Sequence, residues 1–158
     1  MKKYAIEIKW GIIFALMSLL WMVLERLAGL HDAHIEQHAI YTNLVAIPAI
    51  AIYVLGLLEK RKKFYAGTMS YGQGFKAGLF ITLVVTLLSP LTLWLTLSLI
   101  TPDFLENARG YAVESGKMEQ EAADAYFSFT NYLIQGIVGA PIMGILTTAI
   151  VAIFTRKK

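Results

Sequence analysis

Three histidines are the residues of this chain whose types and spacing most clearly suit chemistry. All three fall within one eight-residue window, at His31, His34 and His38. On a helix with 100° per residue their imidazoles lie within about 60° of one another, and Asp32 and Glu36 could add oxygen ligands or orient a ring. The spacing predicts a divalent-metal site, for example for zinc, or a pH-sensitive patch. The alternative is a polar turn whose groups cap helix ends, which a reversal of the chain near this window favours.

An adjacent acid and base, Glu25 and Arg26, stand near the end of an otherwise apolar stretch. Neighbouring residues on a helix point about 100° apart, so these two side chains do not pair easily with each other. We expect each to find a partner elsewhere and to act as a structural anchor. A proton or ion relay is the alternative, but it needs further titratable groups at the same depth, and the sequence places none there.

The composition shows what kind of elements must position these residues. Of 158 residues, 57% are apolar and 16% are charged, whereas soluble domains have about 45–50% and about 25%, and the mean hydropathy is +0.59. One small core cannot bury that much apolar surface, so we expect the excess to face lipid. The lack of cysteine excludes a disulfide-stabilised secreted module, and the composition excludes an ordinary nucleic-acid-binding domain, so no nucleic-acid partner is expected.

Four apolar segments are long enough to cross a bilayer as helices, which takes about 20 residues. They cover residues 10–30, 38–58, 77–100 and 132–154. The chain is therefore predicted to be a single all-α domain, a bundle of four transmembrane helices, in which Glu25 and Arg26 are membrane-embedded charges. A cleaved signal peptide is the alternative for the first segment, but its length and the lack of an A-x-A-like site disfavour cleavage.

Charged residues separate by side of the membrane. Eleven of the fourteen Lys and Arg residues lie before the first segment, between the second and third, or after the fourth, together with two acids; the other nine acids lie elsewhere. The positive-inside rule therefore places both termini and the loop 59–76 in the cytoplasm, and the predicted location is the cell inner membrane. The basic run Lys60, Arg61, Lys62 and Lys63 follows from this topology and could also bind anionic lipid.

The longest extramembrane segment, residues 101–130, is predicted to be a helical periplasmic loop between the third and fourth helices. Apolar residues from Phe104 to Ala112 recur at helical spacing, and a second such stripe begins near Lys117. We expect two short helices here, lying on the membrane or over the bundle.

Small residues recur at every fourth position of the last apolar segment, at Gly136, Ala140, Gly144 and Thr148. Such a stripe lets a second helix approach closely, so it is predicted to be a helix-packing interface, either within the chain or between copies. We expect Gly144→Leu to disrupt folding or oligomerisation.

Prolines interrupt three of the four segments, at Pro48, Pro90 and Pro141. Broken helices around a central site are typical of transporters, whereas kinked packing helices are common in membrane proteins of many kinds. The small size of the chain and the lack of inverted repeats favour simple kinks.

The order of several short motifs resembles a known family. The motifs are Gly29-Leu30-His31-Asp32, Glu59-Lys60-Arg61-Lys62, the run from Tyr71 to Gly78, and Ala122 to Asn131-Tyr132 before a Gly-rich last segment. Over almost its whole length the chain is similar to the bacterial membrane proteins catalogued as domain of unknown function 4199. The resemblance implies a small four-helix inner-membrane protein of Gram-negative bacteria with no established activity, and it supplies no catalytic residues.

The expected function is association with other membrane proteins, as a homo-oligomer or as a small subunit of an envelope complex. The alternative is a small transporter or channel, perhaps linked to a metal, with a polar path lined by Glu25, Thr82, Thr86 and Gln135. No catalytic constellation is visible at one depth, so the chain is not expected to be an enzyme. No cofactor is expected apart from the candidate divalent metal.

Overall fold

The computed structural model describes residues 3–157, and these form helices joined by short turns. Lys2 and Lys158, which contribute to the predicted cytoplasmic charge, lie outside the described residues. In chain order the elements are α1 (Ala5–Leu27), α2 (Ile35–Tyr41), the 3₁₀ turn η1 (Thr42–Val45), α3 (Ala46–Lys63), α4 (Tyr71–Leu95), the π-helical turn η2 (Thr96–Ile100), α5 (Phe104–Glu114), α6 (Gln120–Tyr126) and α7 (Phe129–Thr155).

Four of these helical stretches are long and apolar enough to cross a membrane. They are Ala5–Leu27, Ile35–Lys63, Tyr71–Ile100 and Phe129–Thr155. Large apolar side chains such as Leu16, Leu87 and Phe154 cover their outer surfaces. An apolar surface this continuous is stable only against lipid. The predicted all-α fold with four membrane-type helices is confirmed, and it implies contact with a bilayer.

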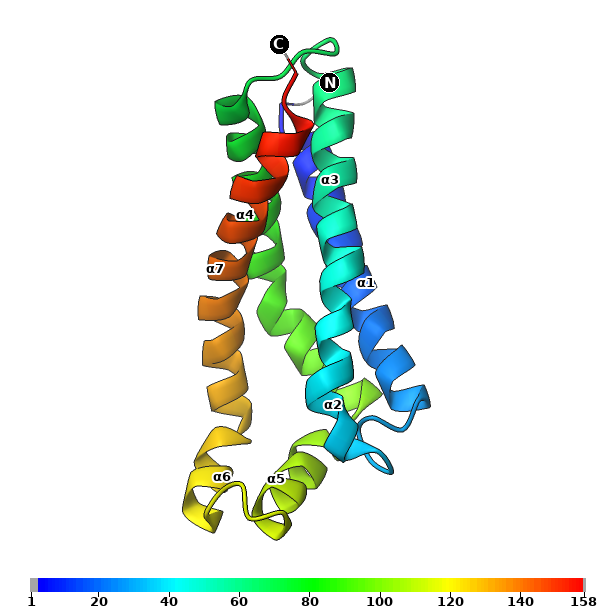
Figure 1. Cartoon of the computed structure of the whole chain (residues 1–158), viewed down its shortest axis with the longest axis vertical. Helices are drawn as coiled ribbons and strands as arrows, with labels where there is room; N and C mark the ends of the chain where they lie inside the picture. Colours follow the sequence, from blue (N-terminus) through cyan, green and yellow to red (C-terminus); the bar gives the residue numbers. More distant parts are fainter. Residues whose placement is uncertain (1–2, 158) are drawn as a thin grey trace.

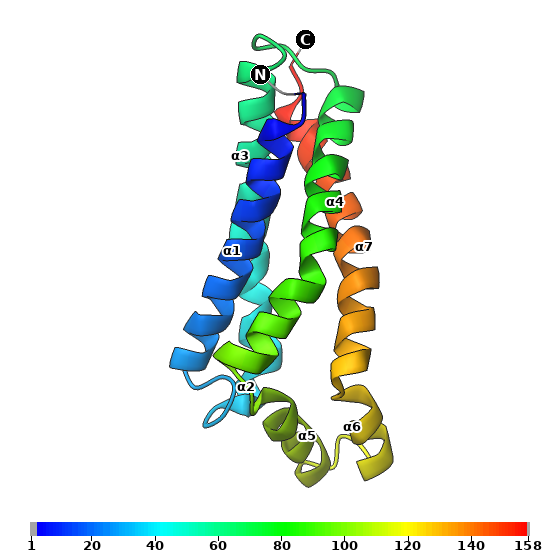
Figure 2. The same ribbon diagram turned by 180° about the vertical axis from the view of Figure 1, so that it is seen from behind.

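The four long helices form an elongated bundle (Figures 1 and 2). Both termini lie at one end, here called the terminal end, and α5 and α6 close the opposite end, here called the cap end. Helix α4 makes the most extensive contacts, with α7 on one side and α1 on the other. The two short helices predicted between residues 101 and 130 are present as α5 and α6, and a turn at Phe127 and Ser128 separates α6 from α7.

The packed core occupies the half of the bundle nearer the terminal end, where Leu57, Ile81 and Ala152 are buried. Small residues let the helices approach closely there. A Cβ added at Gly78 would overlap the side chain of Thr148, and one added at Gly144 would overlap that of Thr82.

Helix α4, which contains Pro90, bends toward α1 and away from α7 as it approaches the cap end (Figure 2). Proline has no N–H, so the carbonyl of Thr86 loses its helical donor, and the hydroxyl of Ser89 donates to that carbonyl at 2.8 Å instead. The helix then continues into the π-helical turn η2. As a result the helices diverge toward the cap end, and their separation there shapes the site.

Candidate functional site

Three side chains with metal-ligating atoms meet at the cap end: Glu25, His31 and His38. One ligand atom from each lies within 4.8 Å of the others. Oε2 of Glu25 is 3.2 Å from Nε2 of His31 and 3.6 Å from Nε2 of His38. The side chains of Glu25 and His31 are each 2% exposed, and that of His38 is 21% exposed. The group, here called the Glu-His-His cluster, is therefore almost removed from solvent.

The end of α1 explains how residues so close in sequence can face one another. Gly29 adopts a φ of +76°, and the N–H of Leu30 donates to the carbonyl of Glu25 while that of Gly29 donates to Arg26. This is a Schellman motif, which favours glycine because a left-handed residue must end the helix. It stops α1 at Leu27 and turns His31 back over the last helical turn.

Helix α2 supplies the third member of the cluster. It begins at Ile35, so His38 lies one turn into the helix, and it runs back toward the bundle. The ring centroids of His31 and His38 are 5.4 Å apart. The Phe104 ring of α5 lies 4.9 Å from each of them, so an aromatic side chain of the cap packs on both imidazoles.

Further hydrogen bonds hold the cluster in place. The indole N–H of Trp21, one turn before Glu25, donates to the second carboxylate oxygen, Oε1, at 2.6 Å. The side-chain amide of Asn107 in α5 donates to the carbonyl of His31 at 2.9 Å. Glu25 is thus oriented with one oxygen toward tryptophan and the other toward the two imidazoles, an arrangement common around metal ligands.

The two distances from the Glu25 carboxylate oxygen to the imidazoles suit a tetrahedral zinc ion. Zinc binds histidine nitrogen and carboxylate oxygen at about 2.0–2.2 Å, which places neighbouring ligand atoms of a tetrahedron about 3.4 Å apart. The separations of 3.2 and 3.6 Å bracket this value. Two imidazoles and one carboxylate also leave a fourth position for water or another ligand.

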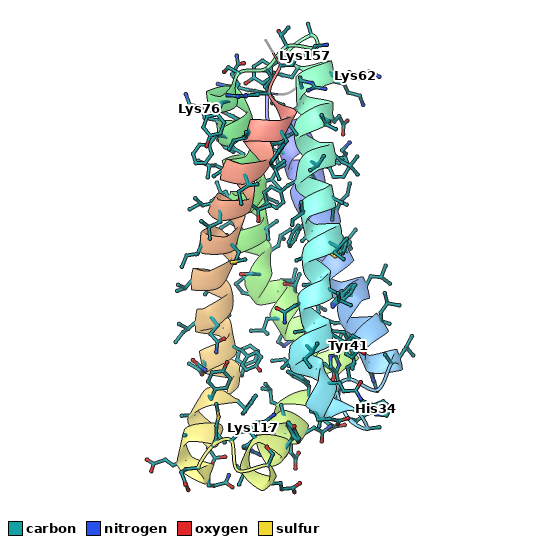
Figure 3. All side chains as sticks on the ribbon, viewed as in Figure 1. His34, Tyr41, Lys62, Lys76, Lys117 and Lys157 are labelled. Atoms are coloured by element: carbon teal, nitrogen blue, oxygen red, sulfur yellow. The ribbon has the colours of Figure 1, made fainter. Side chains whose placement is uncertain are left out.

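His34 does not belong to the cluster. It precedes the first turn of α2, its side chain is 56% exposed, and it lies 4.0 Å from the carboxylate of Glu36. Figure 3 shows it at the outer edge of the cap end. The expectation that three imidazoles share one helical face is wrong, because His31 lies in a turn and the helix begins after His34. Asp32 and Glu36 are exposed as well, and Glu25 is the acid that joins the histidines.

Arg26 and Glu25 have separate partners, as expected. The exposed guanidinium of Arg26 donates to the carbonyl of Ile100, the last residue of η2. This contact joins the end of α1 to the end of the third membrane span.

Two cavities adjoin the Glu-His-His cluster. The first, here called the cap cavity, has a volume of about 310 Å³ and lies between α2, α5, α6 and the start of α7. The second, here called the bundle cavity, has a volume of about 360 Å³ and is lined by residues of all four membrane spans. Their linings share His38, Thr42, Phe104 and Tyr132. The two cavities are therefore neighbours, with His38 at their boundary.

The basic run at the terminal end is not a uniform lipid-facing patch. Lys60 is 3% exposed and forms an ion pair of 2.7 Å with the equally buried Glu7. Arg61 donates to the carbonyl of Thr155 at 2.8 Å, and Lys63 pairs with Glu59 at 2.8 Å. Lys62 is exposed and reaches outward (Figure 3). The prediction of a lipid-binding patch is therefore wrong for Lys60, which joins α3 to α1 inside the bundle.

The small-residue stripe of α7 packs within the chain. Gly144 and Thr148 are buried against Thr82 and Gly78 of α4, whereas Gly136 and Ala140 are half-buried nearer the cap end. The sequence left open whether the partner helix belongs to the same chain. For Gly144 and Thr148 that partner is α4.

A comparison with protein families finds one match. A family model described as "Protein of unknown function (DUF4199)" matches residues 9–157, which is nearly the whole chain. No curated protein and no solved structure matches the chain.

Proposed function

The chain belongs to the family described as "Protein of unknown function (DUF4199)", and from this premise and the Glu-His-His cluster we propose that it is a metal-binding integral membrane protein. The metal is a divalent transition ion such as zinc, for which two imidazoles and a carboxylate are suitable ligands. The role is one of binding, and no reaction is assigned to the chain.

The geometry of Glu25 carries this proposal. An acid that is 2% exposed at the end of a membrane helix is costly unless it is paired. Two imidazoles face the same carboxylate oxygen. A divalent cation bound between these three groups would compensate the buried negative charge. The donor from Trp21 fixes the other oxygen before any ion arrives.

Metal binding would also stabilise the packing of the cap helices α5 and α6 on the bundle. Its ligands come from α1, from the turn after it and from α2, while Asn107 and Phe104 of α5 contact the histidines directly. An ion that binds only the folded arrangement stabilises that arrangement in proportion to its concentration. We propose that metal loading strengthens the docking of α5 against α2.

We propose that the cap end lies in the periplasm and the terminal end in the cytoplasm of a Gram-negative cell. The distribution of Lys and Arg supports this orientation through the positive-inside rule. The site would then bind metal ions from the periplasm.

Association and transport have weaker support. The parts of the α7 stripe that pack most tightly do so against α4 of the same chain. Among the residues expected to line a transport path, Gln135 is exposed, and Thr82 is occupied by hydrogen bonds to Tyr53 and to the carbonyl of Gly78. Metal binding therefore remains the function that the geometry favours.

Zinc titration calorimetry on the full chain in detergent micelles tests the proposal. We expect micromolar or tighter binding of one ion, lost in His31→Ala and His38→Ala and unchanged in His34→Ala. His34→Ala is the matched control, because it removes an imidazole from the same window outside the cluster. Absence of micromolar binding, or equal binding in all four proteins, would overturn the proposal.

A further inference from the structure

The bundle cavity lies among the cap-end parts of the four membrane-type helices, next to Phe104 of α5. Apart from His38, its lining residues are apolar or carry a hydroxyl group; they include Trp21 of α1, Ser89 and Leu93 of α4 and Gly136 of α7. None of its lining residues is Lys, Arg, Asp or Glu. The cavity is lined by α4 and α7 where these helices diverge toward the cap end, so it opens among helices whose outer surfaces are apolar. The surrounding lipid offers apolar acyl chains, which are suitable occupants of such a cavity.

The cap cavity has a different lining. Three tyrosines, Tyr111, Tyr126 and Tyr132, line it together with Lys117 and Glu36. The ammonium of Lys117 donates to the hydroxyl of Tyr111 at 3.0 Å and lies 4.4 Å from the centre of its ring. An ammonium has three donors, so this lysine can still donate to an acceptor in the cavity. Figure 3 places it between α5 and α6.

The two cavities together have the polarity of an amphiphile. The bundle cavity offers mostly apolar walls among the membrane-type helices. The cap cavity beyond them also has apolar walls, and it adds the Lys117 ammonium, three phenol groups and the Glu36 carboxylate. Their linings meet at His38, Thr42, Phe104 and Tyr132. A phospholipid matches this arrangement, because its apolar chain suits the bundle cavity and its phosphate headgroup suits the cation of the cap cavity. Phospholipids also surround the membrane helices.

We infer that one phospholipid of the bilayer occupies the two cavities, with an acyl chain in the bundle cavity and its phosphate at Lys117. The inference goes beyond metal binding, because neither Lys117 nor the bundle-cavity residues of α4 and α7 belong to the Glu-His-His cluster. A structural lipid of this kind fills space that α4 and α7 leave unpacked, and it holds the cap over the membrane.

A pair of glycine substitutions in α7 tests the acyl-chain site. Gly136 lines the bundle cavity, and a Cβ there would meet only Ser89 Oγ, at 4.0 Å, so leucine can enter and fill the space. Gly139, in the same helix, has no atom within 4 Å of its added Cβ among the described residues and does not line the cavity. Gly139→Leu is the matched control.

The full chain is reconstituted in vesicles of phosphatidylethanolamine and phosphatidylglycerol that contain a phospholipid with a photoreactive diazirine at the end of one acyl chain. After irradiation, labelled peptides are mapped by mass spectrometry. We expect labelling of the α4 segment around Leu93 in the wild type and in Gly139→Leu. In Gly136→Leu it should fall roughly tenfold, since the leucine side chain occupies space that the acyl chain needs.

The headgroup is tested by counting the phospholipids that stay bound when the protein is released into mild detergent and weighed by native mass spectrometry. Lys117→Ala should lower the retained phospholipid by up to roughly fivefold, the upper end of the effect of one exposed charge. Equal labelling near Leu93 in Gly136→Leu and the wild type, or unchanged retention in Lys117→Ala, would overturn the inference. Zinc titration of Gly136→Leu should match the wild type, so a failed lipid experiment leaves the metal proposal untouched.

Discussion

Glu25 and His31 are six residues apart, and their side chains meet with 3.2 Å between Oε2 and Nε2. The left-handed Gly29 produces this contact, because the turn it permits folds the chain back over the end of α1. His38 then reaches the same oxygen from α2, after the chain has reversed direction. The carboxylate of Glu25, in the last turn of α1, thus faces one histidine from the following turn and one from α2.

The tryptophan that holds Glu25 should affect metal affinity without being a ligand. Trp21→Phe removes the donor to Oε1 and keeps most of the ring packing. We expect zinc affinity to fall about 10- to 100-fold, as is usual when the hydrogen bond that orients a ligand is lost. The measurement is zinc titration calorimetry.

Trp94→Phe is the matched control for this variant, because Trp94 is largely exposed on α4 and does not line either cavity. Unchanged zinc affinity in Trp21→Phe would show that the indole does not orient the carboxylate.

The buried pair of Glu7 and Lys60 should matter more to stability than exposed pairs do. Lys60→Met leaves the Glu7 carboxylate buried without its partner, which typically costs about 3–5 kcal/mol. The double variant Glu7→Leu with Lys60→Met should recover most of this loss, because both charges are gone. Thermal unfolding in micelles measures the difference.

The exposed pair of Lys63 and Glu59 provides the comparison, and Lys63→Ala should cost less than about 1 kcal/mol. A double variant as unstable as Lys60→Met alone would contradict the assignment of the loss to an uncompensated buried charge.

Glycine positions in α4 and α7 should differ sharply in their tolerance of a methyl group. Gly78→Ala and Gly144→Ala place a Cβ into Thr148 and Thr82, so each should destabilise the bundle by about 1–3 kcal/mol. Gly139→Ala has open space and should be neutral or stabilising by up to about 1 kcal/mol, the gain in helix propensity. Melting temperatures in micelles rank the three variants, and equal values would argue against close α4–α7 packing.

The proposed orientation can be tested with single cysteines, because the natural sequence has none. Both Ser115, which directly follows α5 at the cap end, and Lys62, at the terminal end (Figure 3), are exposed. In spheroplasts, a membrane-impermeant maleimide should label Ser115→Cys and should label Lys62→Cys only after lysis. The reverse pattern would place the cap end in the cytoplasm.

Local sequence patterns predicted the secondary structure well where a single segment contains all the information. Runs of apolar residues identify the four membrane helices, and apolar spacing identifies α5 and α6. Boundaries were less accurate where capping decides them. Helix α4 begins at Tyr71 rather than near residue 77, because Ser70 and Gln73 form a capping box ahead of the apolar run.

The candidate site was predicted only in part. The histidine window drew attention to His31 and His38, but a helical spacing argument also included His34 and could not include Glu25. The signal that could have identified Glu25 was its burial cost, since an acid in a membrane helix requires a partner. The basic run raised the same difficulty, because sequence alone does not show which of four adjacent charges turns inward to meet Glu7.

The sequence by itself determined that the chain forms four apolar helices with basic ends, because hydropathy and charge are properties of each segment and need no partner. Tertiary structure alone decided which side chains meet. Because of the left-handed turn at Gly29, Glu25 and not His34 joins His31 and His38 in the cluster. The close approach of α4 and α7 packs Gly144 and Thr148 against α4 of the same chain. Local signals such as Gly29 set where a helix ends, but contacts of this kind also depend on how the helices cross, and that is decided only when all four helices pack together.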